Sequence, residues 1–512
     1  MPRQLELILT PEQAADDEAI QGCVKNLLRE KFVYIHKRKQ SIDARRLPVI
    51  IRLMVDVYLE GESFESPIWE PDFPKSVPKK SVVIAGFGPA GMFAALHLLE
   101  QGIKPIVIER GKPVKDRRRD LAVLNREGMV NPESNYCFGE GGAGTYSDGK
   151  LYTRSKKRGD VQKVLEIFVS HGADPRILFE AHPHIGTNKL PQIVENIRET
   201  ILQNGGQIHF NTKLTDIIIK NNQISAVRLA SGLEIATEEL ILATGHSARD
   251  IFQLLKDKQI YIETKPFALG VRIEHPQAFI DSIQYKCESR GKFLPPAAYS
   301  LVEQANGRGV FSFCMCPGGI IAPAATAPGE IVVNGWSPSK RNGKYANSGM
   351  VVSVNPLDWE EFNKHGALAA LKYQETIEQK AYAAVGKKLR APAQRLVDFI
   401  HKKTSTSLPD CSYIPGVESA ILDTILPSQI ADSLRTGLIG MGKKMRGYLH
   451  PEAILVGVES RTSSPVKIPR DKETLQHPEI TGLYPCGEGA GYAGGIVSAA
   501  LDGMACAERI KL

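Results

Sequence analysis

Two glycine-rich stretches, which lie far apart in the 512-residue chain, constrain its fold more than any other feature. The first runs Ser81-Val-Val-Ile-Ala-Gly-Phe-Gly-Pro-Ala-Gly-Met92 and predicts a strand, a tight turn and the start of a helix. The second runs Tyr484-Pro-Cys-Gly-Glu-Gly-Ala-Gly-Tyr-Ala-Gly-Gly-Ile496 and predicts an acidic turn before another helix N-terminus. Helix N-termini present free N–H groups and the positive end of a dipole to phosphates. Two such elements can hold one long dinucleotide from both ends, which favours FAD over NAD.

The first stretch has the G-x-G-x-x-G spacing of a dinucleotide-binding turn. Gly86 permits the turn, Gly88 lets the backbone approach a pyrophosphate, and Gly91 lets helix and strand pack closely. Glu109 ends the next apolar strand, where its carboxylate can accept from ribose hydroxyls and disfavours a 2′-phosphate. The alternative is a glycine turn without a ligand, which the strand, the helix and the acid together oppose.

Composition and charge exclude several classes of protein. A net charge of +7 is small for this length and gives no argument for nucleic acid binding. Eight cysteines without a Cys-x-x-Cys pair are no disulfide framework and predict thiols in a reducing compartment. No run approaches the roughly 18 apolar residues of a membrane span, and the first residues lack an apolar signal core. We therefore expect a soluble, cytoplasmic protein without a metal site.

The pattern of predicted elements indicates an α/β protein. We expect a Rossmann-like FAD/NAD(P)-binding domain, an inserted α+β substrate domain and a small, ferredoxin-like N-terminal α/β unit. A three-strand pattern beginning near residue 213 and ending at Gly245 leads the chain back into the dinucleotide sheet. The predicted segments are the N-terminal unit at 1–65, a proline-rich linker at 66–78, the first part of the cofactor domain at 79–264, the inserted domain at 265–470, and the last part of the cofactor domain at 471–512.

Several further motifs give the chain a family resemblance. They are Ser41-Ile-Asp-Ala-Arg45, Phe138-Gly-Glu-Gly-Gly-Ala-Gly-Thr-Tyr-Ser-Asp-Gly-Lys-Leu151, His184-Ile-Gly-Thr187, Phe313-Cys-Met-Cys-Pro-Gly-Gly319, Asn334-Gly-Trp-Ser337 and Glu459-Ser-Arg-Thr-Ser-Ser-Pro465. With these motifs the chain resembles bacterial uncharacterised FAD-dependent, or NAD/FAD-utilizing, dehydrogenases, within the glutathione-reductase-type flavoproteins that carry two dinucleotide motifs. The resemblance implies the fold and non-covalent FAD, and it implies that the 138–151 loop lies along the FAD pyrophosphate and ring. It implies little about the substrate.

The predicted cofactor contacts combine the glycine stretches, this loop and the short motif before Gly245. An acidic turn at Gly487-Glu488 can face the ribityl chain, and the helix opening at Gly494 can support the reduced flavin. The alternatives are a lid for the 138–151 loop and a plain loop before a surface helix at 487–496. The full set is Gly86, Gly88, Pro89, Ala90, Gly91, Glu109, Arg110, Arg117, Gly141, Gly142, Ala143, Gly144, Ser147, Asp148, Lys150, Leu214, Thr244, Gly245, Gly487, Glu488, Gly494, Gly495 and Ile496.

Candidates for catalysis are weaker. Cys314 and Cys316 can relay electrons or attack a substrate, but Cys-x-Cys in a strand is also compatible with two small packed residues. We expect packing and positioning on the substrate side of the flavin rather than a dithiol relay. Arg461 and Arg341 can bind an anionic substrate, with a structural salt bridge as the alternative. His184, like His171 and His182, is predicted to be structural, and the basic runs Lys112–Arg119 and Arg154–Arg158 to be solvated.

The leading hypothesis is an FAD-dependent oxidoreductase that moves hydride or electrons through flavin N5 to or from a small, anionic or neutral substrate. A nicotinamide such as NAD(P)H, where one is used, would bind transiently in the substrate cleft, because no second G-x-G-x-x-G marks a dedicated nicotinamide domain. Otherwise the organic substrate itself is the electron donor. One alternative is a flavin-dependent RNA-modifying protein, supported by the basic residues Lys37-Arg-Lys39 and Arg45-Arg46. The chain, however, lacks the stripe of basic residues with interleaved aromatic residues that is expected of an RNA-binding surface. The other is a non-catalytic protein that holds flavin.

Overall fold

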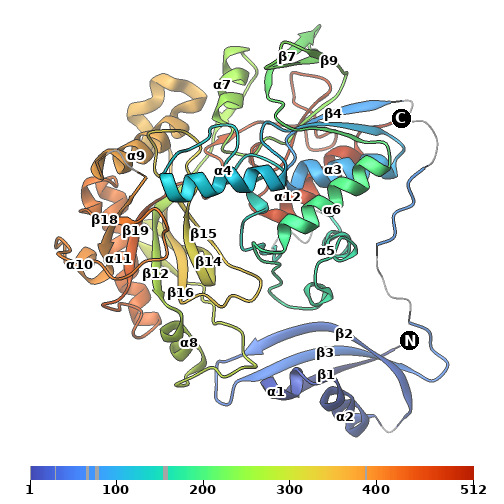
Figure 1. The fold of residues 1–512 in the computed structure, drawn as a ribbon, viewed down its shortest axis with the longest axis vertical. Helices are drawn as coiled ribbons and strands as arrows, with labels where there is room; N and C mark the ends of the chain where they lie inside the picture. The colour runs from blue at the N-terminus through green and yellow to red at the C-terminus, as the bar shows by residue number, and fades with distance from the viewer. Residues whose placement is uncertain (1, 29, 65–68, 75–79, 154–158, 387–388) are drawn as a thin grey trace.

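The structure is a computed structural model that describes residues 2–28, 30–64, 69–74, 80–153, 159–386 and 389–512. Most of the predicted linker at 66–78 and the basic run Arg154–Arg158 lie outside these residues. The chain builds a small antiparallel sheet, a parallel sheet and a large mixed sheet. Figure 1 shows the N-terminal sheet lying apart from the parallel sheet, with the large mixed sheet to the side of both.

The N-terminal unit is a three-stranded antiparallel sheet with two helices on one face. Its elements are β1 (Arg3–Leu9), α1 (Pro11–Ala14), α2 (Asp17–Leu27), β2 (Phe32–Asp43) and β3 (Ile50–Leu59). The strand order is β1-β3-β2. Alternate residues of β3, such as Leu53 and Val55, are buried with Ile20 and Val24 of α2, as the period of two in a strand requires. The ferredoxin-like prediction is wrong. That fold needs another helix and a fourth strand after its third strand, and the described residues of this unit have neither after β3.

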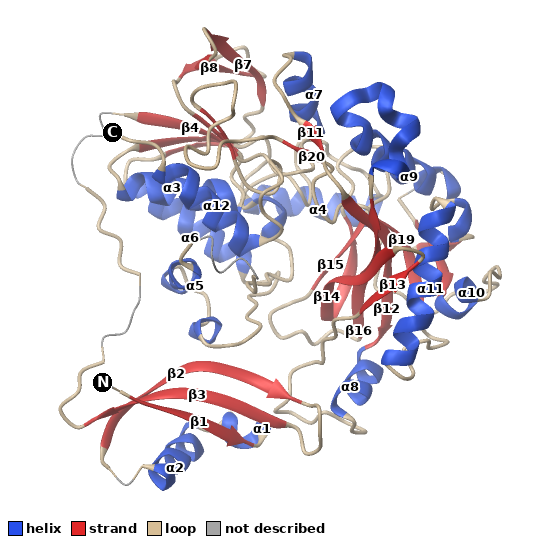
Figure 2. Cartoon of the chain, turned by 180° about the vertical axis from the view of Figure 1, so that it is seen from behind, coloured by secondary structure: helices blue, strands red, loops and turns tan. Residues whose placement is uncertain are grey.

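A five-stranded parallel sheet carries the first glycine-rich turn. Its strands are β4 (Ser81–Ala85), β5 (Lys104–Ile108), β6 (Gln207–His209), β10 (Leu240–Leu242) and β21 (Leu483–Pro485). The order is β21-β10-β4-β5-β6, so the first and last parts of the chain share one sheet. The apolar run of β4 is buried on both faces, which is typical of parallel strands. Figure 2 shows α3 (Pro89–Glu100), α6 (Leu190–Gln203) and α12 (Ile496–Glu508) together on one side of the sheet.

The predicted three-strand pattern is present, with one difference at its end. It forms the antiparallel sheet β7 (Leu214–Lys220), β8 (Gln223–Leu229) and β9 (Glu234–Ala236). The final run that the sequence predicts as one strand divides, so that β10 leaves this small sheet and joins β4 in the parallel one. The helices around these sheets are α4 (Val114–Glu127), α5 (Val161–Ser170) and α7 (Arg249–Asp257).

The large sheet takes up most of the chain between the two glycine-rich stretches. Its elements are β12 (Phe267–Pro276), α8 (Gln277–Tyr285), β13 (Val302–Ala305), β14 (Arg308–Pro323), β15 (Val333–Trp336), β16 (Tyr345–Val354), α9 (Ala369–Ala384), β17 (Ala391–Arg395), α10 (Leu396–Ile400), β18 (Val417–Ser419), α11 (Ser428–Lys444) and β19 (Ile454–Glu459). The strand order is β13-β14-β16-β12-β19-β17-β18, and β15 pairs with β14. Figure 2 shows α9, α10 and α11 along the side of this sheet that faces away from the parallel sheet.

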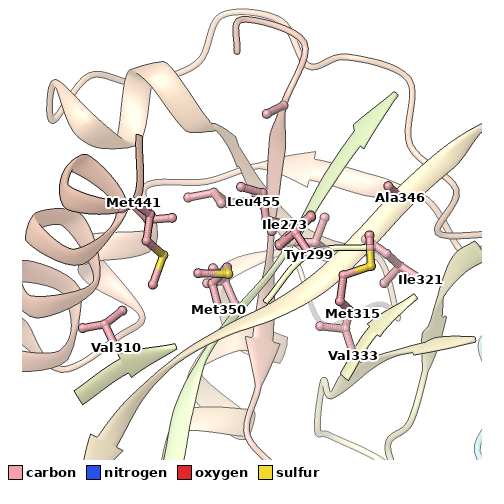
Figure 3. Close-up of a cluster of buried hydrophobic side chains, with 14 of the residues drawn as sticks. Ile273, Tyr299, Val310, Met315, Ile321, Val333, Ala346, Met350, Met441 and Leu455 are labelled. Carbon is pink, nitrogen blue, oxygen red and sulfur yellow. The ribbon is translucent and has the colours of Figure 1, made fainter. Parts of the chain in front are cut away.

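The core of the large sheet fixes which way its strands face. Figure 3 shows Met315 of β14 beside Tyr299 and Ile321, within the cluster of buried hydrophobic side chains that includes Met350 and Leu455.

The chain enters the large sheet just after β11 (Glu263–Thr264) and leaves it just before β20 (Val466–Lys467). These two short strands pair with each other in antiparallel fashion. These strands lie beside the predicted domain limits, and the division of the chain into five segments stays a prediction.

The N-terminal unit joins the rest of the molecule through the edge of β2. Gln40 accepts from the Ala181 N–H at 2.9 Å and donates its own N–H to the Phe179 carbonyl at 2.7 Å. Lys286, just after α8, donates to the Arg45 carbonyl oxygen at 2.9 Å. In the part of the chain that the structure describes, no helix combines the length and the apolar character needed to cross a membrane.

The contact between α3 and α12 gives the first testable prediction. A Cβ at Gly503 would collide with the Ala90 carbonyl oxygen, so the two helices pack backbone to backbone. Gly503→Ala should lower the free energy of unfolding by about 1–3 kcal/mol, the usual cost of overpacking. The measurement is urea-induced unfolding followed by circular dichroism. Gly22→Ala in α2 is the control, because its Cβ meets no described atom within 4 Å. Equal stability of the two variants would contradict the packing argument.

Candidate cofactor and substrate site

The turn between β4 and α3 has the geometry of a phosphate-binding turn. Gly86 has a φ of +101°, and its Cβ would lie 2.5 Å from the Ala243 carbonyl oxygen. A Cβ at Gly91 would collide with the Gly86 carbonyl oxygen, so this glycine brings the helix onto the turn. Gly88 is the N-cap of α3 and gives no side-chain cap to the first turn. A Cβ at Gly88 would make an ordinary contact with the Gly142 Cα at 3.9 Å and meet nothing closer, so a small side chain there is not excluded in the ligand-free chain.

Glu109, predicted to bind a ribose, holds the turn together. Its Oε2 accepts from the Phe87 N–H, and its Oε1 accepts from the N–H groups of Gly111 and Gly139, each at 2.9 Å. The side chain is buried. Because these three amides belong to three separate segments, the carboxylate joins the glycine turn, the end of β5 and the 138–151 loop. One lone pair of Oε2 remains for a ribose hydroxyl.

The 138–151 loop crosses the N-terminus of α3. Gly142–Gly144 form one turn of 3₁₀ helix. A Cβ at Gly142 would lie 3.0 Å from the Gly88 Cα, and one at Gly144 would lie 3.4 Å from the side chains of both Pro89 and Ile496. The loop, α3 and α12 therefore approach one another closely at their glycines.

The second glycine-rich stretch completes this convergence. The Gly487 N–H donates to Asp502 Oδ2 at 2.7 Å, which holds the turn against α12. Gly495 is the N-cap of α12 and has no side-chain cap, so this helix too presents uncapped N–H groups. Glu488 Oε2 lies 3.4 Å from His246 Nδ1, directly after the Thr244-Gly245 motif.

The predicted cofactor contacts divide by exposure. A residue can touch a ligand without rearrangement only where it is open to solvent in the ligand-free chain. The residues that are at least partly open are Gly86, Gly88, Pro89, Arg110, Gly142, Ala143, Gly144, Ser147, Lys150, Thr244, Gly245, Glu488, Gly494 and Gly495. Those that are buried, and so support the site from behind, are Ala90, Gly91, Glu109, Arg117, Gly141, Asp148, Leu214, Gly487 and Ile496.

Arg117 corrects a prediction. It is fully buried, and it donates to the carbonyl oxygens of Asn135, Tyr136, Glu140 and Gly142 at 2.8–2.9 Å. It therefore anchors the loop from inside and offers no donor to the adenosine end of a cofactor. The reason lies outside the local sequence, because its partners are carbonyl groups of a loop that begins about 18 residues later.

Arg110 keeps partial exposure. Its guanidinium lies 4.2 Å from the centre of the Phe138 ring and pairs with Glu133 and Asp250 at 2.7 and 2.9 Å. These contacts orient the planar group at the end of β5. It stays a candidate for the adenosine end of the cofactor.

A cavity of about 510 Å³ lies beside the N-terminus of α12. Phe313 of β14 lines it, together with Gly494 and Gly495 of the second glycine-rich stretch. The other lining residues among those described are Tyr152, Thr153, Tyr492, Ala493, Val497 and Ser498. Residues of the large sheet and of the second glycine-rich stretch therefore line the same cavity. The sequence did not predict Tyr152 or Phe313 as lining residues.

Lys150 and the two cysteines meet next to this cavity. The Lys150 Nζ lies 3.7 Å from Cys314 Sγ and 3.6 Å from Cys316 Sγ. Cys314 is partly exposed and has a φ of +46°, whereas Cys316 is buried. The segment is a bulged part of β14, whose pairing with β16 shifts at Phe313/Cys316. The bulge turns both thiols toward the 138–151 loop.

A buried ion pair lies behind the cysteines. Arg272 of β12 donates to Glu459 Oε2 and to Asn347 Oδ1, each at 2.7 Å, and to the Cys314 carbonyl oxygen at 2.6 Å. Both charged side chains are fully or almost fully buried. Burial raises the pKa of Glu459 to about 7, and the Arg272 charge opposes this rise. Sequence reasoning missed Arg272, whose partners come from three other strands.

Asp148 is a second correction among the loop residues. Its carboxylate is buried and pairs with Arg341 at 2.7 Å and with Lys150 at 3.4 Å. Burial would raise the pKa of Asp148, but the charges of Lys150 and Arg341 lower it to about 2. Asp148 therefore orients Lys150 rather than facing a cofactor, and Arg341 is not free for an anionic substrate. His184 lies in the same layer, and its Nε2 donates to the Ser339 carbonyl oxygen at 3.0 Å.

Arg461 corrects the third prediction. All five of its N–H donors are used by the side chains of Glu330, Glu378, Thr326 and Ser247. The guanidinium is buried, and Arg249 binds the same two carboxylates at 2.8 Å. The structure thus supports the salt bridge that the sequence left open as the alternative to substrate binding.

Cys486, Asp502 and Cys506 form the one buried group of potential metal ligands among the described residues. Arg470 donates to both Asp502 oxygens, at 2.6 and 3.0 Å, and to Cys506 Sγ at 3.4 Å. A cation already occupies the carboxylate, so this group gives no argument for a metal ion.

Parts of the chain match known protein families. Residues 266–462 match the family described as "FAD-dependent protein, C-terminal domain-like", and residues 1–58 match a domain of unknown function. A Clostridium beijerinckii protein described as "Uncharacterized protein" is 41% identical over 505 residues, which cover 95% of this chain and 93% of that protein. The chain belongs to this family of FAD-dependent proteins.

Solved structures show only distant likeness. Glycine oxidase from Bacillus cereus is 14% identical, covers 84% of this chain and 94% of its own, and has a TM-score of 0.31. A geranylgeranyl bacteriochlorophyll reductase-like protein from Thermoplasma acidophilum is 12% identical, with coverages of 84% and 77% and a TM-score of 0.33. At these scores the function must be argued from the geometry of the chain itself.

The Arg461 network gives the second prediction. Arg461→Met should lower the free energy of unfolding by about 3–5 kcal/mol, because it leaves two buried carboxylates with one cation fewer. Denaturant unfolding measures this loss. Arg390→Met, which breaks an exposed pair with Glu418, should change stability by less than about 1 kcal/mol. A variant of Arg461 with native stability and a raised KM for an anionic substrate would restore the substrate-binding role.

Proposed function

We propose that the protein is an FAD-dependent oxidoreductase that acts on a small molecule in the cavity beside α12. The observation that carries the proposal is the meeting of the uncapped N-termini of α3 and α12 with the Gly142–Gly144 turn. Glycines at this junction let a backbone approach a ligand closely, and two helix N-termini suit the phosphates of FAD. The family match supports the same cofactor.

The residues would divide the cofactor between them. Gly88 and Gly142 would face the pyrophosphate, Arg110 the adenosine end, and Glu488 the ribityl chain, while the buried Glu109 would hold the turn from behind. The N-terminus of α12 would direct N–H groups at the flavin pyrimidine and favour its reduced, anionic form. Bound FAD supplies hydride and electron transfer through N5 of its ring system.

The cavity between Phe313 and Gly494–Gly495 would hold the substrate. Aromatic and small side chains form much of its lining, which favours a compact substrate with an apolar or aromatic group. An anionic substrate loses the support that the sequence offered, because Arg461 and Arg341 are both paired with buried carboxylates. A nicotinamide, where one is used, would bind transiently in this same cavity.

The RNA-modifying alternative gains no support from the basic residues of the N-terminal unit. Lys37 pairs with Asp17 at 2.7 Å, Arg38 with Asp56 at 3.4 Å, and Arg45 with Asp43 at 2.6 Å. These acids offset the positive charge that a phosphate backbone would need. A non-catalytic flavin-holding protein would have the same cofactor site. It would differ only in that no electron donor reduces its flavin.

The third prediction tests the cofactor site without disturbing the fold. The protein should purify yellow, with about one releasable FAD per chain, and Gly88→Val should abolish FAD binding while the protein still folds. The reason is that a side chain at Gly88 has room in the ligand-free chain but would occupy the space of the pyrophosphate. Titration of the apo-protein with FAD measures affinity, and circular dichroism checks the fold. Gly22→Ala is the control.

Catalysis is tested separately, by the visible spectrum before and after anaerobic addition of NADH, NADPH and a metabolite panel. Bleaching of the flavin by one donor supports the oxidoreductase. A yellow protein that no donor reduces would favour the flavin-holding alternative, and a colourless protein that refuses FAD would overturn the proposal altogether.

A further inference from the structure

Lys150 lies at the centre of a layer of charged groups. Its ammonium lies 3.4 Å from Asp148, which also pairs with Arg341, and the buried Arg272 pairs with Glu459 behind it. The Lys150 Nζ also lies 3.7 Å from Cys314 Sγ and 3.6 Å from Cys316 Sγ. A thiolate at either sulfur would therefore have a cation in direct contact.

The two cysteines occupy unequal positions. Cys314 is partly exposed and directly follows Phe313, which lines the cavity, whereas Cys316 is buried behind it. The Cys316 sulfur lies 3.2 Å from the Cys314 carbonyl oxygen, and both sulfurs lie within 3.7 Å of the same ammonium group. Met315, between them, points into the hydrophobic core (Figure 3). The strand therefore presents two thiols to one cation, one accessible and one sheltered.

The groups around the sulfurs favour a thiolate at Cys314 rather than at Cys316. A hydrogen bond from the Cys316 thiol lowers the pKa of Cys314 well below its ordinary value, and Lys150 and Arg272 lower it further against the effects of burial and of Asp148. Burial raises the pKa of Cys316. Glu459 also interacts with Cys314, and Tyr299, whose own pKa burial raises to about 12, faces Cys316. The sequence alone showed neither a cation nor access, which is why it favoured a packing role.

We propose that Cys314 and Cys316 form a redox-active dithiol at the cavity, in which Cys314 is the attacking thiolate and Cys316 the resolving thiol. The co-reactant is a small disulfide. The Cys314 thiolate forms a bond to one sulfur of that disulfide, whose S–S bond breaks and releases a thiolate. The released thiolate takes the proton of Cys316. The Cys316 thiolate then attacks the Cys314 sulfur, the intramolecular disulfide forms and the second thiolate leaves. The cysteine pair is oxidised by two electrons and the small disulfide is reduced to two thiols.

This activity goes beyond the proposed flavin chemistry and does not require it, so the two fail independently. The test uses the full chain and glutathione disulfide under anaerobic conditions, with intact-mass measurement and peptide mapping. The wild-type protein should lose two hydrogens and yield a Cys314–Cys316 disulfide. Cys316→Ser should instead keep one glutathionyl group on Cys314, because nothing resolves the mixed disulfide. Cys314→Ser should do neither, and Cys287→Ser, the control, should behave as wild type.

Three outcomes would overturn the proposal. They are a wild-type protein that does not react, a wild-type protein that keeps glutathione on Cys314 without forming the disulfide, and a Cys314→Ser variant that reacts as fast as wild type. Circular dichroism confirms that each variant is folded.

The role of Lys150 is measured by the pH dependence of iodoacetamide alkylation at Cys314. The wild-type rate should already be near its maximum at neutral pH, because alkylation follows the thiolate fraction. Lys150→Met should slow alkylation at pH 7 by about tenfold or more, since one pKa unit changes the thiolate fraction by about that factor. Lys150→Arg keeps the positive charge and should restore most of the rate. An unchanged pH profile in Lys150→Met would overturn the assignment of the ammonium as the partner of the thiolate.

Discussion

The carboxylate of Glu109 is the interaction on which the rest of the site depends. A single buried side chain accepts from the amides of Phe87, Gly111 and Gly139, which belong to three segments that the chain must bring together. A carboxylate can accept several hydrogen bonds at once, and bonds to a charged acceptor are stronger than neutral ones. The glycine turn, the end of β5 and the 138–151 loop therefore take up one arrangement before any cofactor arrives. Such preorganisation lowers the entropy lost on binding.

The same loop carries a second set of constraints on its other side. Arg117 fixes its early part from beneath, and the ion pair of Asp148 with Arg341 fixes its end against the large sheet. Arg272 and Glu459 continue this layer of charge into the sheet itself. Charged groups at this depth are stable only where each has a partner, so the layer specifies one relative position of the two sheets at the point where the cavity opens.

Local patterns in the sequence predict those parts of the site that depend on the backbone. The spacing of Gly86, Gly88 and Gly91 indicates the turn because each glycine answers a local steric demand, and the structure shows those demands directly. Strand and helix positions around this turn follow from hydrophobic periodicity in the same way.

The roles of charged side chains are not predictable in this manner. The partners of Arg461 lie 83 to 214 residues away in the chain, and those of Arg272 lie 42 to 187 residues away. Nothing next to an arginine in sequence tells a buried structural ion pair from an exposed substrate contact. The bulge at Cys314 was missed for a related reason, because it arises from the pairing of β14 with β16 and not from the Pro-Gly-Gly that follows it. The ferredoxin-like prediction erred by extending a correct β-α-β-β pattern beyond the strands that the unit possesses.

The order of strands in the parallel sheet has a consequence for biosynthesis. β21 and α12, from residues 483 to 508, complete a sheet and a helix layer that begin with β4 and α3 at residues 81 to 100. A nascent chain therefore carries the first half of the site through the synthesis of roughly 380 further residues, at the usual 5–20 residues per second, before the second half leaves the ribosome. During that interval two surfaces have no partner. They are the edge of β10 that later pairs with β21 and the face of α3 that later packs against α12. Protection of these surfaces, by the early packing of α6 or by chaperones, is thus a requirement of the topology itself, independent of how stable the finished protein is.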